Sequence, residues 1–298
     1  MIYECSVQTN AGGEELREHG NRLFPAACYN DQLPDDVIPW HWHNELELGL
    51  IECGTAVVEI GSERYHIHSG EAFFINSNIF HNASSLDGEL CLLHSIVFHP
   101  RVITGGTDTI FWQKYMQPLM ENESCIGLHL LPDSSWQQSI IESIAALWQS
   151  AETEEYAYEL HMRNELSHII ELLCRHQPAV NKKTFGKTQR DNTRIKEMIT
   201  FIQNNYDRNL TISEIAAVCA ISPSECMRCF HAAINTTPIA YLKGYRLQQA
   251  AYKLHFTTDK IYNIAQDCGF QEMSYFAKSF REVYGRTPSE YRKSLSVT

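Results

Sequence analysis

The sequence predicts a multidomain α+β protein, with an N-terminal β-barrel or sandwich that carries packed helices and an all-α C-terminal domain. Three observations support this prediction. Residues 24–99 read as short strands separated by turn residues about every 8–12 positions. Apolar residues take a helical period between residues 107 and 176. Residues 212–291 then contain one helical unit twice.

Six strands are expected near the N-terminus, because apolar and polar residues alternate there between turn residues. The expected strands are residues 45–53, 55–60, 64–68, 71–75, 80–84 and 91–98. Gly54, Gly61 and Gly70 mark three of the turns. Many short strands at even spacing are typical of a sandwich or barrel, and residues 1–105 are predicted to form this body.

Residues 106–176 are predicted to form a helical packing and dimerisation segment. The first apolar stripe is Ile140, Ile144, Leu147 and Trp148, and the second is Leu160, Leu166, Ile169, Ile170, Leu172 and Leu173. Both stripes have the spacing of a helix that buries one face. We expect the two helices to pack on the barrel and to provide the contact of a homodimer.

Charge is divided unevenly along the chain, whose net charge is −12. Residues 1–190 carry 11 Lys and Arg against 26 Asp and Glu, whereas residues 191–298 carry 13 against 10. The acidic part is therefore excluded as a nucleic-acid surface, and the mildly basic part needs specific contacts besides phosphate attraction. The polar segment 177–190, with Pro178 and Gly186, is predicted to be an interdomain linker.

The C-terminal repeat can be followed residue by residue. The first copy contains Ile212, Ile215, Ala216, Cys219, Ile221, Arg228, Phe230, Thr237, Pro238 and Tyr241. The second contains Ile261, Ile264, Ala265, Cys268, Phe270, Lys278, Phe280, Thr287, Pro288 and Tyr291. The offset is 49 residues up to Ile221 and Phe270, and 50 residues from Arg228 and Lys278 onward. Each copy has the pattern of a helix-turn-helix unit.

Capping and turn residues mark the first helix of each copy. Thr211 and Glu214 have the spacing of a capping box, and residues 257–259 supply cap candidates for the second copy. Ala220 and Gly269 fall at the two turns, where a left-handed backbone suits glycine.

A connecting helix is expected between the copies, starting at Pro238. Its length of about 17 residues corresponds to about 25 Å. With the flanking turns, such a helix can hold two recognition helices about one turn of DNA apart, which is about 34 Å. The chain is therefore predicted to contact two adjacent major grooves of double-stranded DNA.

Residues 191–294 resemble the DNA-binding domain of AraC-type transcription regulators. The resemblance rests on Ile264, Ala265, Gly269, Phe270, Phe276, Phe280, Gly285, Pro288, Tyr291 and Arg292, with Pro238, Tyr241, Arg246 and Ala250 on the connector. It implies that residues 191–298 form the DNA-binding domain and that the second helix of each unit enters the major groove. Those helices are Pro223–Ala233 and Glu272–Tyr284.

Helical spacing then selects the residues that face DNA. They are Ser224, Glu225, Met227 and Arg228 on the first recognition helix, and Met273, Ser274, Tyr275 and Lys278 on the second. Arg228 and Lys278 are at equivalent repeat positions and can reach guanine or phosphate. Glu225 departs from this pattern, because a carboxylate repels phosphate or accepts a hydrogen bond from a cytosine amine.

Ten cysteines are scattered without the spacing of a disulfide framework. Cys226 and Cys229 form a C-x-x-C pair that can bind zinc, but a closed site needs two further ligands and none lies nearby in sequence. Packing of both side chains inside the helix is the favoured interpretation.

His41, His43, Glu47 and His81, with Gly54 and Gly70, resemble the metal-binding pattern of cupin barrels. The resemblance implies a cupin-like barrel in which three imidazoles and a carboxylate hold Zn, Fe, Mn or Ni. Alternatively, Glu45 and Glu47 lie on a polar face while Leu46, Leu48 and Leu50 fill the core. An effector pocket is predicted at the same place. It comprises His41, His43, Glu47, His81, Trp42 and Tyr65.

The predicted function is a DNA-binding transcription regulator, an activator and not an enzyme, controlled by a small-molecule effector such as a sugar or related metabolite. The alternatives are a metal-responsive regulator and a cupin metalloenzyme that use His41, His43, Glu47 and His81. No cofactor is required by the first hypothesis, while a divalent metal belongs to the alternatives. RNA polymerase is an expected partner of an activator. With no apolar span and no signal peptide in the sequence, we expect a cytoplasmic homodimer without membrane contact.

Overall fold

The structure, a computed structural model, describes residues 1–4, 7–9, 13–36, 38–176, 185–234 and 236–295. It divides into two compact units. The first comprises Met1–Gln8 and Glu14–Gln189, and the second Thr9–Gly13 and Arg190–Thr298. The predicted α+β organisation is confirmed, because all strands of the described chain belong to the first unit and the second is helical. No helix within the described ranges has the length and apolar character needed to span a membrane.

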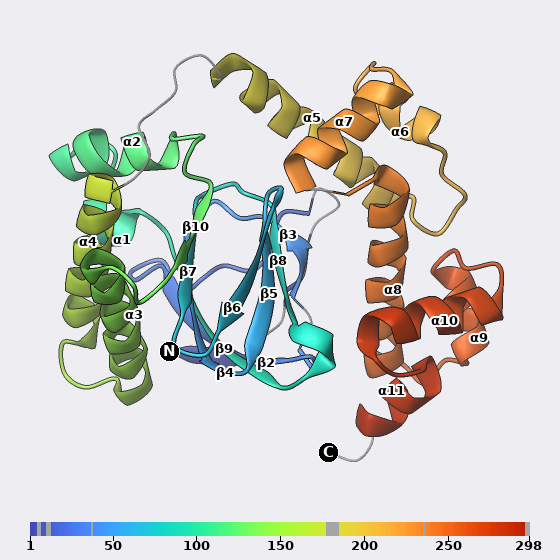
Figure 1. Cartoon of the computed structure of the whole chain (residues 1–298), viewed down its shortest axis with the longest axis horizontal. Helices are drawn as coiled ribbons and strands as arrows, with labels where there is room; N and C mark the ends of the chain where they lie inside the picture. The colour runs from blue at the N-terminus through green and yellow to red at the C-terminus, as the bar shows by residue number, and fades with distance from the viewer. Residues whose placement is uncertain (5–6, 10–12, 37, 177–184, 235, 296–298) are drawn as a thin grey trace. The chain divides into compact units, whose positions relative to one another are not determined.

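Two sheets form the body of the first unit (Figure 1). The six-stranded sheet has the order β1 (Ile2–Glu4), β2 (Ala26–Leu33), β9 (Cys91–Phe98), β4 (Leu46–Cys53), β7 (Ala72–Ile75) and β10 (Gly127–Leu130). The four-stranded sheet has the order β3 (Ile38–His41), β8 (His81–Ser85), β5 (Thr55–Ile60) and β6 (Glu63–His68). Ile51, Phe73 and Ile75 belong to the core cluster shared with Val58 and Ile67 of the smaller sheet.

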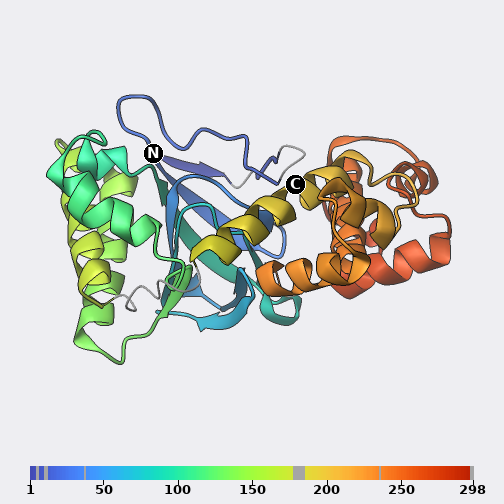
Figure 2. The same cartoon turned by 90° about the horizontal axis from the view of Figure 1, so that it is seen from above.

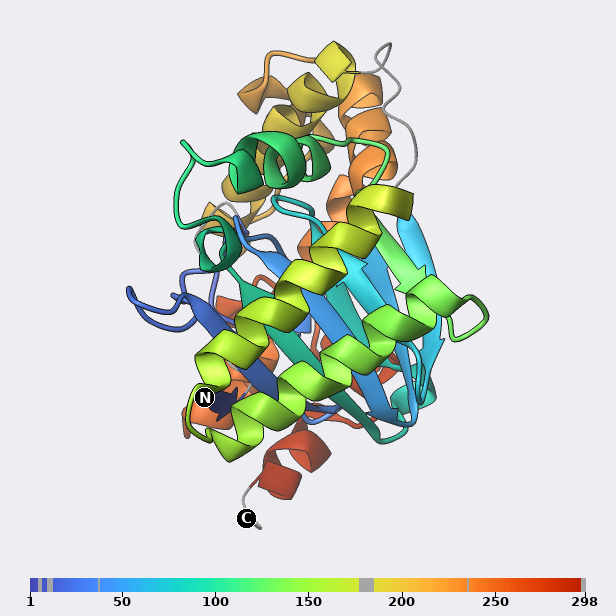
Figure 3. The same cartoon turned by 90° about the vertical axis from the view of Figure 1, so that its left-hand side faces the viewer.

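Helices cover the outer face of the six-stranded sheet. Figure 3 shows α3 (Ser135–Thr153) and α4 (Tyr158–His176) crossing it side by side, and Figure 2 shows them on the side away from the smaller sheet. Leu46, Leu48 and Leu50 of β4 belong to the same hydrophobic core cluster as the buried residues of α3 and α4. Both faces of β4 are therefore buried, one against helices and one against strands.

The shorter helical elements of the first unit are η1 (Leu86–Gly88), α1 (Arg101–Thr104), the π-helix η2 (Trp112–Met116) and α2 (Gln117–Met120). The two predicted apolar stripes are buried as expected apart from two residues of the second stripe. Leu160 is 60% exposed, and Leu172 is partly buried. Leu160 lies on the outer side of the first turn of α4, where no neighbouring element of the unit covers it.

Four strands were not expected from the sequence. β1, β2 and β3 lie before residue 45, and β10 lies inside the segment predicted to be helical. β10 has only four residues and is defined by its pairing with β7, from Gly127 opposite Ile75 to Leu130 opposite Ala72. Because the partner lies about 55 residues away, local periodicity does not reveal this strand.

The second unit consists of helices joined by short turns. They are α5 (Phe185–Asn204), α6 (Ile212–Val218), α7 (Pro223–Ile234), α8 (Pro238–Phe256), α9 (Ile261–Asp267), α10 (Met273–Tyr284) and α11 (Pro288–Leu295). Each predicted helix-turn-helix pair is present, as α6–α7 and α9–α10. The connector α8 has 19 residues, about 28 Å of helix.

Some predicted boundaries differ from the structure. The capping box of Thr211 and Glu214 is present, with both reciprocal hydrogen bonds. The cap expected from residues 257–259 is absent from α9. Lys260 occupies the N-cap position of this helix, and its side chain makes no capping hydrogen bond. In the predicted linker, residues 177–184 lie outside the described residues, and residues 185–190 already belong to α5.

Candidate functional site

A buried centre lies between the two sheets of the first unit. It contains His41 at the end of β3, His43 in the following loop, Glu47 on β4 and His81 at the start of β8. One ligand atom of each lies within 4.8 Å of those of the other three, and all four residues are buried. His41 and His81 are direct partners across the antiparallel pair of β3 and β8.

His41, His43 and Glu47 do not lie on a single strand. β3 ends at His41 and β4 begins at Leu46, so the chain passes from one sheet to the other within this segment. The alternative that puts Glu47 on a polar outer face is also excluded, because Glu47 is only 7% exposed. Its neighbours Leu46 and Leu48 pack on the opposite side of the strand, under the helices.

Hydrogen bonds orient the three imidazoles of the centre. The Nδ1 atom of His41 lies 2.8 Å from the Pro39 carbonyl oxygen, and that of His81 lies 2.8 Å from the Ile79 carbonyl oxygen. His43 Nδ1 is 3.3 Å from the Glu45 carbonyl oxygen. A carbonyl oxygen accepts only, so each Nδ1 carries a proton, and in the neutral imidazole Nε2 is the nitrogen that carries the lone pair. Metal-bound histidines are commonly held in this way.

The Nε2 atoms of His43 and His81 converge on the Glu47 carboxylate, and that of His43 is within hydrogen-bonding distance of it. His43 Nε2 is 3.2 Å and His81 Nε2 is 3.0 Å from Glu47 Oε2. The His81 Nε2 atom is fully buried and makes no well-formed hydrogen bond. A buried nitrogen lone pair without a donor is costly, and a cation at the centre of the four residues would satisfy it.

Two further residues reach the centre from the N-terminal segment, and neither was predicted. Glu15 Oε2 lies 3.8 Å from His41 Nε2 and 3.3 Å from His19 Nε2. His19 Nδ1 is 2.8 Å from the Tyr29 hydroxyl oxygen. The Glu15 and His19 side chains are both buried. Their four-residue spacing belongs to neither a helix nor a strand here, so no periodic signal points to them.

Among the described residues, one small cavity adjoins this centre. The cavity beside Glu15, His19, His41 and Glu47 has a volume of about 30 Å³. Such a volume holds a water molecule or an ion, whereas sites for organic ligands are about 300–1,000 Å³.

The remaining predicted pocket residues lie elsewhere. The ring of Trp42 lies 6.5 Å from that of Phe80. Tyr65 is on β6, and its ring lies 5.8 Å from that of His129. His66 and His68 are exposed on the same strand.

Burial lowers the pKa of His41 to about 3, with neighbouring His81 adding to the effect. For Glu47, burial alone would raise the pKa, but His81 and His43 outweigh it and hold that pKa well below the ordinary range. At neutral pH the centre thus offers a neutral imidazole and a carboxylate, the ionisation states that bind metal.

The metal-free chain is expected to lose stability of its first unit as the pH falls below about 6.5. There the unfolded chain gains a proton on His41 while the folded protein keeps this imidazole neutral. One such proton corresponds to at most about 1.4 kcal/mol per pH unit. Glu47 acts in the same direction at lower pH, because its stabilising charge is lost as the pH falls through its depressed pKa.

Thermal unfolding in chelator between pH 7.5 and 5 measures this dependence. The His41→Gln variant, which lacks the titrating imidazole, is the control and should show a flatter profile. Equal slopes for the two proteins would contradict the assignment of the proton to His41.

The face of α7 that was predicted to contact DNA is partly exposed. Ser224 is exposed, while Glu225, Met227 and Arg228 are half-buried. Glu225 binds Arg228 through two hydrogen bonds of 2.9 and 2.7 Å and lies 3.6 Å from Arg194. The carboxylate therefore holds the Arg228 guanidinium on the helix surface.

The corresponding face of α10 is more open. Ser274, Tyr275 and Lys278 are exposed, and Lys278 lies 4.0 Å from Glu282 at the limit of an ion pair. Met273 differs from the expectation, because it is half-buried against the core of this unit. Phe276 and Phe280 fill that core, as their spacing predicts.

Two further exposed residues of α7 and α10 were not among those predicted to face DNA. His231 and Arg281 are at the 50-residue offset of the repeat, one turn beyond Arg228 and Lys278. The repeat itself was the signal that could have found them. Cys226 and Cys229 lie on the other side of α7 and are buried, and burial raises the pKa of Cys226 to about 11.

Comparisons with known proteins agree with both units. A family model described as an AraC-like ligand binding domain matches residues 24–167, and one described as a helix-turn-helix domain matches residues 215–294. The chain belongs to the AraC family of transcription regulators.

This AraC-family chain is 28% identical over 289 residues to YdeC, an uncharacterized HTH-type transcriptional regulator of Bacillus subtilis, covering 95% of this chain and 97% of that protein. It is 26% identical over 280 residues to the HTH-type transcriptional activator RhaS of Mannheimia succiniciproducens, covering 93% and 97%. Among solved structures, ToxT of Vibrio cholerae aligns at 16% identity with a TM-score of 0.49, over 92% of this chain and 99% of that one.

Proposed function

We propose that this AraC-family regulator reads two adjacent major grooves with α7 and α10. The observation that carries the proposal is the equivalence of Arg228 and Lys278, which lie 50 residues apart on the accessible faces of the two second helices. The buried faces of the same helices are occupied by Phe230 and by Phe280. Ser224, Tyr275 and their neighbours are therefore the side chains available to base edges and phosphates.

Arg228→Ala and Lys278→Ala are each expected to weaken DNA binding by roughly 5- to 100-fold, since one lost base or phosphate contact is worth about 1–3 kcal/mol. A lost phosphate contact also lowers the salt dependence of binding by about one unit of slope. The probe is a duplex that the unmodified chain enriches from a random-sequence pool, titrated by fluorescence anisotropy at several salt concentrations. The stoichiometry of the same titration shows whether two chains bind together.

Two further variants separate DNA contact from a structural role. Lys293→Ala removes an exposed lysine of α11 and should leave affinity unchanged. Glu225→Gln releases the Arg228 guanidinium from its ion pair and should tighten binding by a few-fold with a steeper salt slope. Unchanged affinity in both the Arg228 and Lys278 variants, with intact folding by circular dichroism, would overturn the assignment.

We further propose that the regulator is an activator that acts as a homodimer and contacts RNA polymerase. Activation is supported by the RhaS relative, which is a transcriptional activator. Tyr156, just before α4, and Leu160, in its first turn, are both exposed, and we propose that a self-contact of the helical segment covers them. The relatives named above are regulators, and we propose that this chain likewise is not an enzyme.

A divalent metal ion is the second candidate effector. Three oriented imidazoles and a carboxylate, whose ligand atoms lie within 4.8 Å of one another, favour Zn, Fe, Mn or Ni, and the 30 Å³ cavity suits an ion better than a sugar. The same lack of space argues against a metalloenzyme, which needs an open coordination position for its substrate. Elemental analysis of the chain after exposure to these ions and gel filtration tests the proposal.

A further inference from the structure

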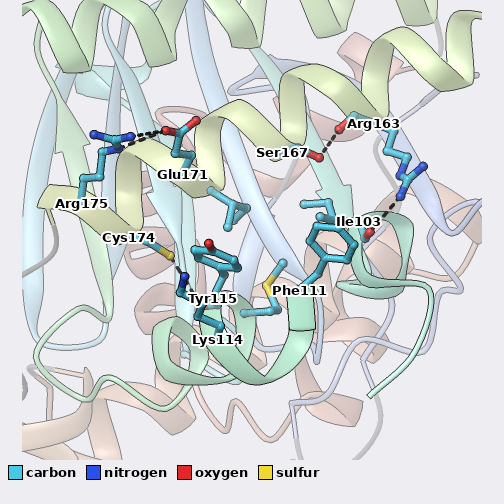
Figure 4. A pocket seen from close by; sticks show the side chains of 11 residues that line it. Ile103, Phe111, Lys114, Tyr115, Arg163, Ser167, Glu171, Cys174 and Arg175 are labelled. Atoms are coloured by element: carbon cyan, nitrogen blue, oxygen red, sulfur yellow. Dashed lines mark hydrogen bonds and ion pairs between the residues drawn. The ribbon is translucent and has the colours of Figure 1, made fainter. Parts of the chain in front are cut away.

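A second cavity lies in the helical layer of the first unit, apart from the His and Glu centre. Its volume is about 540 Å³, and it is lined by α1, η2 and α4 (Figure 4). None of its lining residues belongs to the sheets. This volume is in the range of sites for small organic molecules, about 300–1,000 Å³.

The floor of this cavity is apolar and its mouth is aromatic. Ile103, Met116 and Ile170 are buried in it. Phe111 and Tyr115 are 50% and 37% exposed, and Figure 4 shows their rings between η2 and α4. Large rings left open to solvent beside a cavity provide the apolar contact area of a binding site.

Cationic groups stand at the same mouth without a neutralising carboxylate. The Arg163 guanidinium donates one hydrogen bond, of 3.3 Å, to the Ile103 carbonyl oxygen, and Lys114 Nζ lies 5.0 Å from the Tyr115 ring centre. Over the described part of the chain, neither forms an ion pair. By contrast, Arg175 is paired with Glu171 at 2.6 Å on the same wall. The cavity therefore carries a net positive charge near Lys114 and Arg163.

The backbone that presents Lys114 and Tyr115 is unusual. Trp112–Met116 form a π-helical turn inside an otherwise α-helical segment. Such turns are rare and frequently occur at functional sites. The nearby Cys174 thiol adds no negative charge, since burial raises its pKa to about 11.

We propose that this cavity binds a small amphipathic monoanion, whose apolar body occupies the floor and whose carboxylate or sulfonate pairs with Lys114 and Arg163. The two features that select this class are the buried apolar floor and the two unneutralised cations at its mouth. The site is a second ligand site of the effector-binding unit, and it does not depend on metal binding at His41, His43, Glu47 and His81.

The probe is 8-anilino-1-naphthalenesulfonate, an aromatic monoanion whose fluorescence rises in apolar sites, titrated into the full chain. We expect saturable binding at one site per chain. The double variant Lys114→Gln, Arg163→Gln should weaken it by at least about 10-fold, because charge-assisted pairs are the strong ones. Both side chains are at the surface, so the variant is expected to fold. N-phenyl-1-naphthylamine, the neutral analogue, should lose less than about 2-fold.

Two controls make the result specific to this cavity. Glu171→Gln with Arg175→Gln removes the neutral ion pair without changing the net charge, and should change affinity by less than about 3-fold. Ser167→Trp places a ring in the cavity and should abolish binding of both dyes. Sulfonate binding that survives Ser167→Trp, or that Lys114→Gln with Arg163→Gln does not weaken, would overturn the proposal. Equal weakening of both dyes by the cation variant would overturn the role of charge.

Discussion

Mn²⁺ added to the metal-free chain is expected to raise the free energy of unfolding of the first unit by about 4 kcal/mol once its free concentration is a thousand times the dissociation constant. The corresponding shift of Tm is roughly 10 °C for a unit of this size. The reason is that four ligand atoms within 4.8 Å are assembled only in the folded unit. Mn²⁺ is a suitable probe because it prefers imidazole and carboxylate to thiolate, and the chain has ten cysteines.

Glu47→Gln is expected to remove most of this metal-dependent shift, because it deletes the anion on which His43 and His81 converge. Glu45→Gln is the matched control. Glu45 is an acidic neighbour with a carboxylate oxygen 3.9 Å from His43 Nδ1, but it lies outside the ligand set. The comparison uses the difference between metal-loaded and metal-free protein, so a change in the metal-free Tm does not affect it. The same shift in both variants, or none in the unmodified chain, would exclude a metal centre.

Gly269→Ala is expected to destabilise the second unit by about 3 kcal/mol, a loss of roughly 10–20 °C in Tm. Gly269 has φ +78°, where any side chain adds strain, and a Cβ atom there would lie 2.8 Å from the Tyr206 carbonyl oxygen. It would also lie 2.8 Å from the Arg246 guanidinium. Arg246 cannot withdraw cheaply, because it donates to the carbonyl oxygens of Tyr206, at 2.6 Å, and Arg208, at 2.8 Å.

The equivalent turn of the first copy provides the reverse experiment. Ala220 also has a positive φ, of 51°. Ala220→Gly should stabilise the unit by about 0.5–1 kcal/mol, since the relief of left-handed strain slightly exceeds the entropy that glycine loses on folding. Differential scanning calorimetry of both variants gives the two values. A Gly269→Ala protein as stable as the unmodified chain would show that this turn does not constrain α9 against α10.

The helix-turn-helix units were predictable because their determinants are local. In the first helix-turn-helix unit these determinants are the capping box of Thr211 and Glu214 and the turn residue Ala220. In the second they are the turn residue Gly269 and the core positions of Phe276 and Phe280. Within each unit they are close together in sequence. The ion pair between Glu225 and Arg228 is equally local, at a spacing of three residues, yet it was not anticipated. It changes the role of Glu225 from a direct obstacle to DNA into a partner of the contacting arginine.

The sheets were only partly predictable, because strand pairing depends on residues far apart in the chain. β10 exists through its contact with β7, and β1, at the N-terminal end, through its parallel pairing with β2. Of the residues predicted to line an effector pocket, the structure brings His41, His43, Glu47 and His81 together, whereas the rings of Trp42 and Tyr65 lie beside those of Phe80 and His129.

By itself, the sequence determined the family, the duplicated helix-turn-helix unit and the four residues of the buried centre, because each depends on residue type at fixed spacing. Only the tertiary structure decided how that centre is built. It brings His41 and His81 together across one sheet, supplies Glu47 from the other and adds Glu15 from the N-terminal segment. It also set the volume of the cavity beside Glu15, His19, His41 and Glu47, about 30 Å³. Packing between distant segments sets these distances and volumes, and no local pattern in the chain encodes them.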